Sequence, residues 1–250
     1  MRSRTPSPGR VLPDGTPLQN LLLASLPTRE YNRIARHLRL ESAVLGDALH
    51  EHGRRIDNVY FPNGGVFSIT NRMRNGGLVE VATVGREGML GVGVFLGDRT
   101  ATGRTFLQVA DGPVAALAVA RFVEETASTG SFREVIGLYA QASLLQTMQC
   151  TACNALHDAT QRCCRSLLQT HDRVEADDFA LKQEFLAIML GVRRATVTVV
   201  LGALQQAGLI SSRYGRIRVL RRKSLEAASC ECYAVIRRHF TRLGLSDTPK

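Results

Sequence analysis

The sequence has no apolar run long enough to cross a lipid bilayer. Its longest candidates, 21–26 and 114–120, fall far short of the roughly 20 apolar residues that a spanning helix needs. The basic N-terminus, MRSRTPSPGR, is not followed by the apolar segment of a signal peptide. We therefore expect a cytoplasmic protein that has no membrane partner.

The signatures of common catalytic sites are also missing. Side chains such as His50, Glu80 and Asp98 follow no Ser/His/Asp order and no metal-ligand spacing. The glycines between 85 and 97 are not followed by a helix that could cradle a phosphate, so turns of a β-structure explain them better. The sequence predicts that the protein is not an enzyme and has no catalytic residue, cofactor or metal.

Cysteine is absent from the first 149 residues, and all six cysteines lie between 150 and 232. A chain of 250 residues does not depend on disulfides as a stapled miniprotein does, so we expect reduced, structural thiols. Cys150 and Cys153 nevertheless have ligand-like spacing, and His157 and Cys164 fall on the same helix face. A thiol- or metal-responsive site on a long helix therefore stands as an alternative to small residues packed in a helical seam.

The charge of the chain is unbalanced and concentrated. There are 32 Lys and Arg against 22 Asp and Glu, which gives a net charge of +10. Most of the excess lies in 181–223, where nine basic residues stand against one acid, Glu184. Such a basic cluster is typical of a surface that binds a polyanion, and above all duplex DNA.

The chain is long and apolar enough for two modest domains. After a segment 1–17 that we expect to be disordered, 18–40 has helical spacing. Short β-rich runs then alternate with turn signals such as Pro62-Asn63-Gly64-Gly65, which predicts a small antiparallel barrel or jelly roll. The expected strands are 58–61, 65–70, 78–84, 105–109 and 113–118.

A long helix follows over 131–168. Ser131 and Glu134 have the spacing of a capping box, and neither Gly nor Pro occurs between 138 and 180. About 36 helical residues would span roughly 54 Å, too long for burial in one small domain. A 4-3 repeat predicts that this helix pairs with its copy in a dimer. The predicted interface residues are Leu138, Leu145, Gln149, Ala152, Leu156, Ala159 and Cys163.

The basic segment has the pattern of a winged helix-turn-helix. Helices are expected over 183–190 and 193–207, joined by Gly191-Val192, and a hairpin is expected around Tyr214-Gly215. Arginine at the start of the second helix suits guanine, because its planar fork meets O6 and N7 together. Outward arginines of the hairpin are expected to contact the DNA backbone. The predicted DNA contacts are Arg193, Arg194, Thr196, Thr198, Arg213, Arg216 and Arg218.

The order of these parts, with the motifs LGVRRATV, LGALQQAGLI and YGRIRV, resembles the Crp/Fnr regulators. HEHGRRIDNVYFPNGGVFSI and VEVATVGREGMLGVGVFLG in the sensor, HDR at 171–173 and the tail SLEAASCECY extend the resemblance over roughly 18–240. It implies an α+β protein in three parts: an antiparallel cyclic-nucleotide-binding-like sensor over 18–130, a dimerisation helix over 131–168, and a winged helix-turn-helix over 169–250. The implied function is a homodimeric bacterial transcription regulator of palindromic duplex DNA. RNA polymerase and an unidentified small-molecule effector are the implied further partners.

The chain departs from the family pattern in the recognition helix. Members of the family typically read bases with an Arg-Glu pair and a second Arg four positions after the Glu. Here Arg194 occupies the position of the first Arg, but Ala195 replaces the Glu and Val199 replaces the second Arg. Without the Glu there is no acceptor for the cytosine amino group, so the operator should differ from that of the catabolite regulator.

The sensor departs further. Gly91-Val92 stands where cyclic-nucleotide binders have Gly-Glu, so the carboxylate for the ribose is missing. Arg104 and Thr105 resemble the pair that holds the cyclic phosphate and are candidate effector ligands, with an ordinary surface strand as the alternative. We expect that cyclic AMP binding has been lost. An iron–sulfur cluster of the Fnr kind is not expected either, because no N-terminal cysteine cluster exists.

Overall fold

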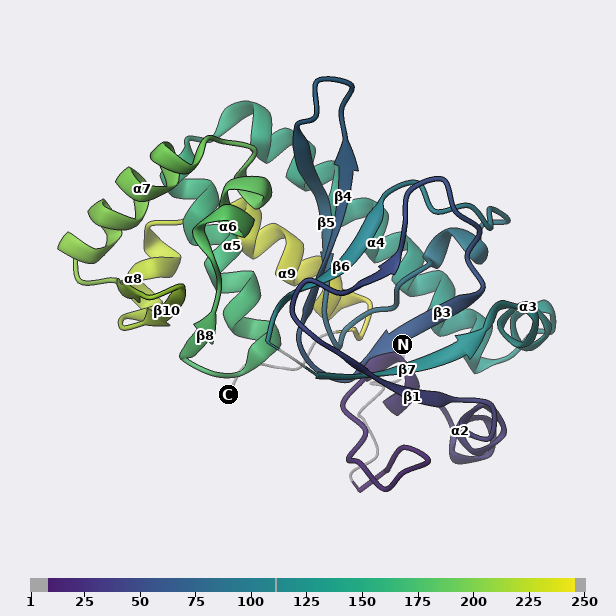
Figure 1. Cartoon of the computed structure of the whole chain (residues 1–250). Helices are drawn as coiled ribbons and strands as arrows, with labels where there is room; N and C mark the ends of the chain where they lie inside the picture. Colours follow the sequence, from purple (N-terminus) through teal and green to yellow (C-terminus); the bar gives the residue numbers. More distant parts are fainter. Residues whose placement is uncertain (1–8, 111, 246–250) are drawn as a thin grey trace.

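The first part of the chain is a β-structure of two antiparallel sheets (Figure 1). The computed structural model describes residues 9–110 and 112–245. Buried side chains of both sheets, such as Phe61 and Phe67, belong to one hydrophobic core, which confirms the predicted α+β class with an antiparallel sensor. One sheet has the order β1 (Arg39–Ala43), β7 (Gly112–Ala118), β3 (Asn58–Pro62), and the other has the order β2 (Ala48–His50), β6 (Arg104–Val109), β4 (Val66–Arg72), β5 (Leu78–Val84).

The N-terminal region is more ordered than predicted, and its helical part is divided into two helices. Val11 bridges Pro17 and Leu12 is buried in the core, so the expectation of disorder is wrong for residues 9–17; residues 1–8 lie outside the described part. The helical pattern over 18–40 divides into α1 (Leu21–Ala24) and α2 (Thr28–Ala35). Pro27, the N-cap residue of α2, lacks the N–H that a continuous helix would need there.

Helix α4 (Ser131–Leu156) follows α3 (Val119–Ala127) and the short 3₁₀ turn η1 (Val92–Val94) of the sensor. Its start differs from the predicted capping box, because Ser131 is already helical. The carboxylate of Glu30, on α2, instead accepts hydrogen bonds from the backbone N–H groups of Ser131 and Phe132 at 3.3 and 3.0 Å. A negative charge at a helix N-terminus also interacts favourably with the helix dipole.

The predicted single helix over 131–168 is wrong, because the helix stops at His157. His157 has an extended backbone, with φ −105° and ψ 149°, and Asp158 begins α5 (Ala159–Val174). The Asp158 side chain accepts from the backbone N–H groups of Thr160 and Gln161 in a capping box. A strong N-cap at this position favours a new helix start over continuation.

The C-terminal part contains the second hydrophobic core and a helix that returns to the sensor. Ile236 and Phe240 of the last helix lie in the core of the sensor, and this helix packs beside α4 (Figure 1). Within the described residues no single helix is long and apolar enough to cross a membrane. The helices Gln183–Leu190 and Arg194–Gln206 reach that length and composition only when they are taken together, and they are bent by 102° relative to each other. The elements are β8 (Asp178–Ala180), α6 (Gln183–Leu190), α7 (Arg194–Gln206), β9 (Ile210–Arg213), β10 (Arg216–Val219), α8 (Arg222–Ala227) and α9 (Cys232–Arg242).

Candidate nucleic-acid interface

Helices α6 and α7 form a helix-turn-helix as the sequence predicted. The turn is made at Gly191, whose φ of +60° favours glycine, and Gly208, with φ +66°, follows the end of α7. The inward stripe of α7 packs on α6 and α5, which leaves the opposite face of α7 in solvent. The buried residues of that stripe are Val197, Val200, Leu201 and Leu204.

The outward face of α7 carries both charge and an apolar patch. Arg193 and Arg194 are exposed, and neither forms a salt bridge within the described part of the chain. Thr196 is exposed, whereas the Thr198 hydroxyl lies 3.2 Å from Gln183 Oε1 and from the Arg194 carbonyl, so it is already hydrogen-bonded. Val199 is 72% exposed on the same face. The face therefore combines cations free to reach DNA with a methyl-bearing side chain that the sequence analysis did not count as a contact.

The wing is the hairpin β9–β10, with Tyr214 and Gly215 at its tip in the left-handed region. Tyr214 is fully exposed, and Arg213 forms no salt bridge among residues 9–110 and 112–245. Arg216 and Arg218, which the sequence presented as free cations, both bind Asp178 on β8. The Nε–Oδ distances are 2.6 and 3.1 Å.

These two arginines change the electrostatics of the wing. The hydrogen bond from Arg216, assisted by Arg218, holds the pKa of Asp178 below its usual value, so the carboxylate stays charged. Asp178 thus offsets part of the positive charge of the wing. Since both arginines are more than half exposed, the ion pairs are weak and their guanidinium groups can exchange Asp178 for a phosphate.

A groove of about 460 Å³ opens between the start of α6, the start of α7 and the wing. Lys182, Arg194 and Arg213 supply positive charge to its lining, against one acid, Glu184, which lies 3.9 Å from Lys182. Gln183 begins α6 there. The first backbone N–H groups of a helix have no partner within the helix. The groove can therefore accept an anion such as a DNA phosphate.

A polar network that the sequence analysis missed fixes the DNA-binding part internally. Arg222 Nη2 lies 2.6 Å from Asp172 Oδ1 and 2.7 Å from the Tyr233 hydroxyl, and Arg222 Nη1 lies 2.5 Å from His171 Nδ1. Arg222 is thus an internal structural cation of this region. In the same HDR motif, Arg173 donates to Glu87 and Thr83 of the sensor. The motif joins α5 both to the C-terminal region and to the β-sheet.

The candidate effector pair does not form one site. Arg104 begins β6 at the surface, where its Nε donates to Glu51 at 3.2 Å and its guanidinium lies over Phe106. Thr105 is only 3% exposed. Successive side chains of a strand point to opposite faces, and from Thr105 to Val109 the strand is buried on both of them. The alternative of an ordinary surface arginine fits the observed contacts of Arg104.

The structure separates the residues predicted to form the dimer seam. Cys163 is buried within the helix-turn-helix core, and Gln149 donates to Cys232 Sγ of α9 at 3.0 Å. Leu138 packs against the sensor core, and Leu145 and Ala159 are half-buried, so only Ala152 and Leu156 of the predicted set are exposed. The large apolar side chains of α4 that are exposed are Leu156 and two residues outside the predicted set, Leu144 and Met148, at 81, 61 and 60% exposure.

The C-terminal part of the chain matches a known domain family. A family model described as the Crp-like helix-turn-helix domain matches residues 161–228, the region that holds α6, α7 and the wing. The chain carries a Crp-like helix-turn-helix domain. No curated protein matches the chain.

Solved structures extend the likeness to the whole fold. FixK2 from Bradyrhizobium japonicum superposes with a TM-score of 0.67 at 14% identity, covering 77% of this chain and 98% of FixK2. A transcriptional regulator of the CRP family from Thermus thermophilus, TTHB099, gives 0.65 at 16%, covering 76% and 96%. CLP, the c-di-GMP-responsive global regulator of Xanthomonas campestris, gives 0.64 at 19%, covering 77% and 99%. The resemblance to Crp/Fnr regulators is therefore confirmed: by family in the helix-turn-helix domain, and by fold over the rest.

Proposed function

We propose that the protein is a sequence-specific DNA-binding transcription regulator that acts as a homodimer on a palindromic site. The observation that carries this proposal is the exposed start of α7, where Arg193 and Arg194 lie beside the basic groove and the wing. A helix-turn-helix presents this end of its second helix to the major groove.

The outward face of α7 suggests a mixed half-site. Arg194 is our chief candidate for a bidentate contact to guanine, and Val199 offers its methyl groups to a thymine. Thr196 is a second candidate, whereas Thr198 would have to exchange its bonds within the protein. Arg193, Arg213, Arg216 and Arg218 are assigned to the phosphates, where they set position rather than sequence.

The proposed homodimer would form through a different surface, on α4. Leu144 and Met148 are four residues apart, so they lie on one face of α4, and Leu156 continues the exposed apolar side chains towards its end. Pairing two copies of α4 along this face would remove these side chains from water. We propose it as the dimer interface in place of the seam predicted from the sequence.

The sensor is proposed to have lost cyclic AMP binding. The side chain of Val92 supplies no carboxylate, and Arg104 is engaged by Glu51. An effector, if the sensor binds one, must use other contacts. Cytoplasmic location and contact with RNA polymerase follow from the proposed role and belong to the same proposal.

The test is selection of binding sites from random duplexes, followed by affinity measurements on the selected site and on unrelated DNA. Arg194→Ala should weaken binding mainly to the selected site. Arg216→Ala should weaken binding to all duplexes similarly and reduce the salt slope by about 1. Arg238→Ala, an exposed arginine on α9, is the control. Failure to enrich any sequence would contradict the assignment, and so would an Arg194→Ala variant that, like Arg216→Ala, loses the same affinity for both DNAs.

A further inference from the structure

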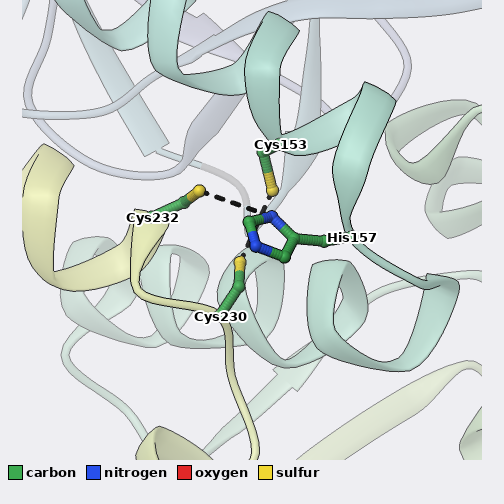
Figure 2. Close-up of side chains that lie close together, drawn as sticks. All are labelled: Cys153, His157, Cys230 and Cys232. Carbon is green, nitrogen blue, oxygen red and sulfur yellow. Dashed lines mark hydrogen bonds between the residues drawn. The ribbon is translucent and has the colours of Figure 1, made fainter.

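Three cysteines and a histidine meet at the break between α4 and α5. Cys153 and His157 come from the end of α4, and Cys230 and Cys232 come from the segment that leads into α9 (Figure 2). Cys153, Cys230 and Cys232 are at most 3% exposed and form a small core of their own. Cys150, which the sequence paired with Cys153, lies outside this group, and so does Cys164.

We propose that Cys153, His157, Cys230 and Cys232 bind one Zn²⁺ ion in a tetrahedral site. One ligand atom from each of the four residues lies within 4.8 Å of all the others. The Sγ atoms of Cys153 and Cys230 are 3.5 Å apart, and Cys232 Sγ is 3.6 Å from His157 Nδ1. Around a single zinc, ligand atoms at tetrahedral angles stand roughly 3.5–3.8 Å from each other. The side chains need little movement to reach that geometry.

The donor set distinguishes zinc from other occupants. Thiolate and imidazole ligands in a tetrahedral arrangement select zinc among the common divalent ions, whereas magnesium and calcium prefer oxygen. An iron–sulfur cluster holds several irons and needs its ligands spread around them, but these four ligand atoms converge on one point. The sulfur separation of 3.5 Å is also far longer than the roughly 2.05 Å of a disulfide.

The surroundings supply the groups that zinc ligands usually contact. His157 turns Nδ1 to Cys232, while its Nε2 lies 3.2 Å from Glu231, so one ring nitrogen faces the site and the other faces a carboxylate. Such a carboxylate fixes the ring orientation and raises the basicity of the ligand. The Gln149 amide donates to Cys232 Sγ at 3.0 Å, which would stabilise a thiolate.

A buried cation completes the charge balance. Arg165 is 5% exposed, and within the described residues it forms no salt bridge and its Nε has no hydrogen-bond partner. Its Nη1 donates to Cys150 Sγ at 3.2 Å and to Gln169 Oε1 at 3.0 Å. The guanidinium interacts electrostatically with Cys150, and also with Cys153 and Cys230 of the site. Three thiolates, a neutral imidazole and Zn²⁺ carry a net charge of −1. A zinc site would therefore place a second negative charge near this buried guanidinium, in addition to the carboxyl group of Glu80.

The position of the site indicates what zinc would do. His157 is the residue at which α4 ends, and Cys232 is the first residue of α9. One ion would therefore tie the break between α4 and α5 to the start of the C-terminal helix. It would restrict movement of the helix-turn-helix relative to α4. This role is independent of the proposed function, because it is measured through metal content and protection rather than through DNA binding.

The experiment measures metal in the purified full-length chain. We expect about one zinc per chain and, after replacement by Co²⁺, the visible absorption of a tetrahedral thiolate site. Cys153→Ser, Cys232→Ser and His157→Ala should each reduce the zinc content to near zero. Cys150→Ser, one helical turn away, is the control and should keep it. Glu231→Gln should keep the site but weaken zinc affinity about 10–100-fold.

A second measurement uses the unaltered protein, so that misfolded variants do not decide the result. Zinc added to chelator-treated protein should protect Cys153, Cys230 and Cys232 from alkylation, and leave the alkylation of Cys150 unchanged. Protection confined to these three thiols supports the site. The proposal is overturned if the protein binds no zinc, if zinc remains in all the ligand variants, or if Cys153 and Cys230 are joined by a disulfide in the purified protein.

Discussion

Arg216 reaches Asp178 diagonally across the pairing of β10 with β8, and its Nε lies 2.6 Å from Asp178 Oδ1. Arg218 binds the other oxygen of the same carboxylate. One acid thus holds two of the wing's arginines in place. It orients them, but it also lowers the positive potential that the wing presents to DNA. The acid and the phosphates of a duplex compete for the same guanidinium groups.

We therefore expect Asp178→Asn to strengthen binding to every duplex by several-fold and to steepen the salt dependence. Each additional phosphate contact changes the slope of log K against log salt by about 0.9. Asp177→Asn removes the same charge one position away without releasing a wing arginine, and it is the control. Salt titrations on the selected site and on random DNA make the measurement. Equal effects of the two variants would show that net charge alone is responsible.

Arg222 should be important for stability rather than for DNA binding. Removing its side chain in Arg222→Ala takes from Asp172, His171 and Tyr233 the guanidinium that all three contact, so that only the bond from the Tyr233 hydroxyl to Asp172 and the contact of His171 with Asp177 remain. We expect a loss of about 1–3 kcal/mol in the free energy of unfolding, as for other buried or half-buried polar groups that lose a partner. Denaturation in urea measures it.

The neighbouring Lys223 provides the comparison for this change. It is exposed, and no salt bridge involves it among the described residues. Lys223→Ala should change stability by less than about 0.5 kcal/mol. A similar loss in both variants would place the effect in the helix α8 as a whole, and not in the network around Arg222.

How well a feature of this protein could be predicted from its sequence depends on how far apart along the chain the residues that cause it lie. Helix α6, its glycine turn and strand β5 were predicted within a residue because their signals are local: periodicity, a glycine with positive φ, and alternation. The end of α4 was missed although its cause is also local, since Asp158 and Gln161 form a capping box inside an unbroken helical pattern. The cysteine site joins residues about 77 positions apart, and nothing in the spacing relates them. The pairing of Asp178 with the wing depends on strand register, which the sequence pattern does not determine.

The proposed dimer face can be disrupted without damage to the monomer. Leu144→Arg with Met148→Arg places charges on side chains that are already about 60% exposed, so folding of the single chain should be unaffected. Burial of an apolar side chain contributes about 1.5–3 kcal/mol, and each substitution acts in both copies. We expect dimer dissociation constants to rise at least 100-fold. Analytical ultracentrifugation measures this change, with circular dichroism to check the fold.

The contrasting change is Leu145→Ala, at a position predicted from the sequence to lie in the seam but half-buried within the chain. It should lower the stability of the monomer more than it weakens the dimer. A variant of Leu144 and Met148 that remains dimeric would exclude this face of α4 as the interface.

Glu80 on β5 should make stability depend on pH. Burial raises the pKa of its carboxyl group to about 7, although hydrogen bonding by Ser68 and the positive charges of Arg165 and Arg173 act in the opposite direction. Between the ordinary pKa of 4.5 and about 7, the folded protein keeps a proton that the unfolded chain has lost. The free energy of unfolding must therefore fall as the pH rises through this range, and the loss is complete above it.

Glu80→Gln keeps the size and an oxygen that can accept from Ser68 but removes the ionisation. The variant should resemble the parent protein near pH 4.5 and be more stable than it near pH 8, with the difference developing between these values. Urea denaturation at a series of pH values measures it, and the comparison with the parent cancels the titration of the histidines. Because Glu80 is half-buried rather than sealed from water, the gain should be smaller than the full pKa shift would give. A difference between the two proteins that stays constant from pH 4.5 to 8 would show that Glu80 ionises as readily in the folded chain as in the unfolded one.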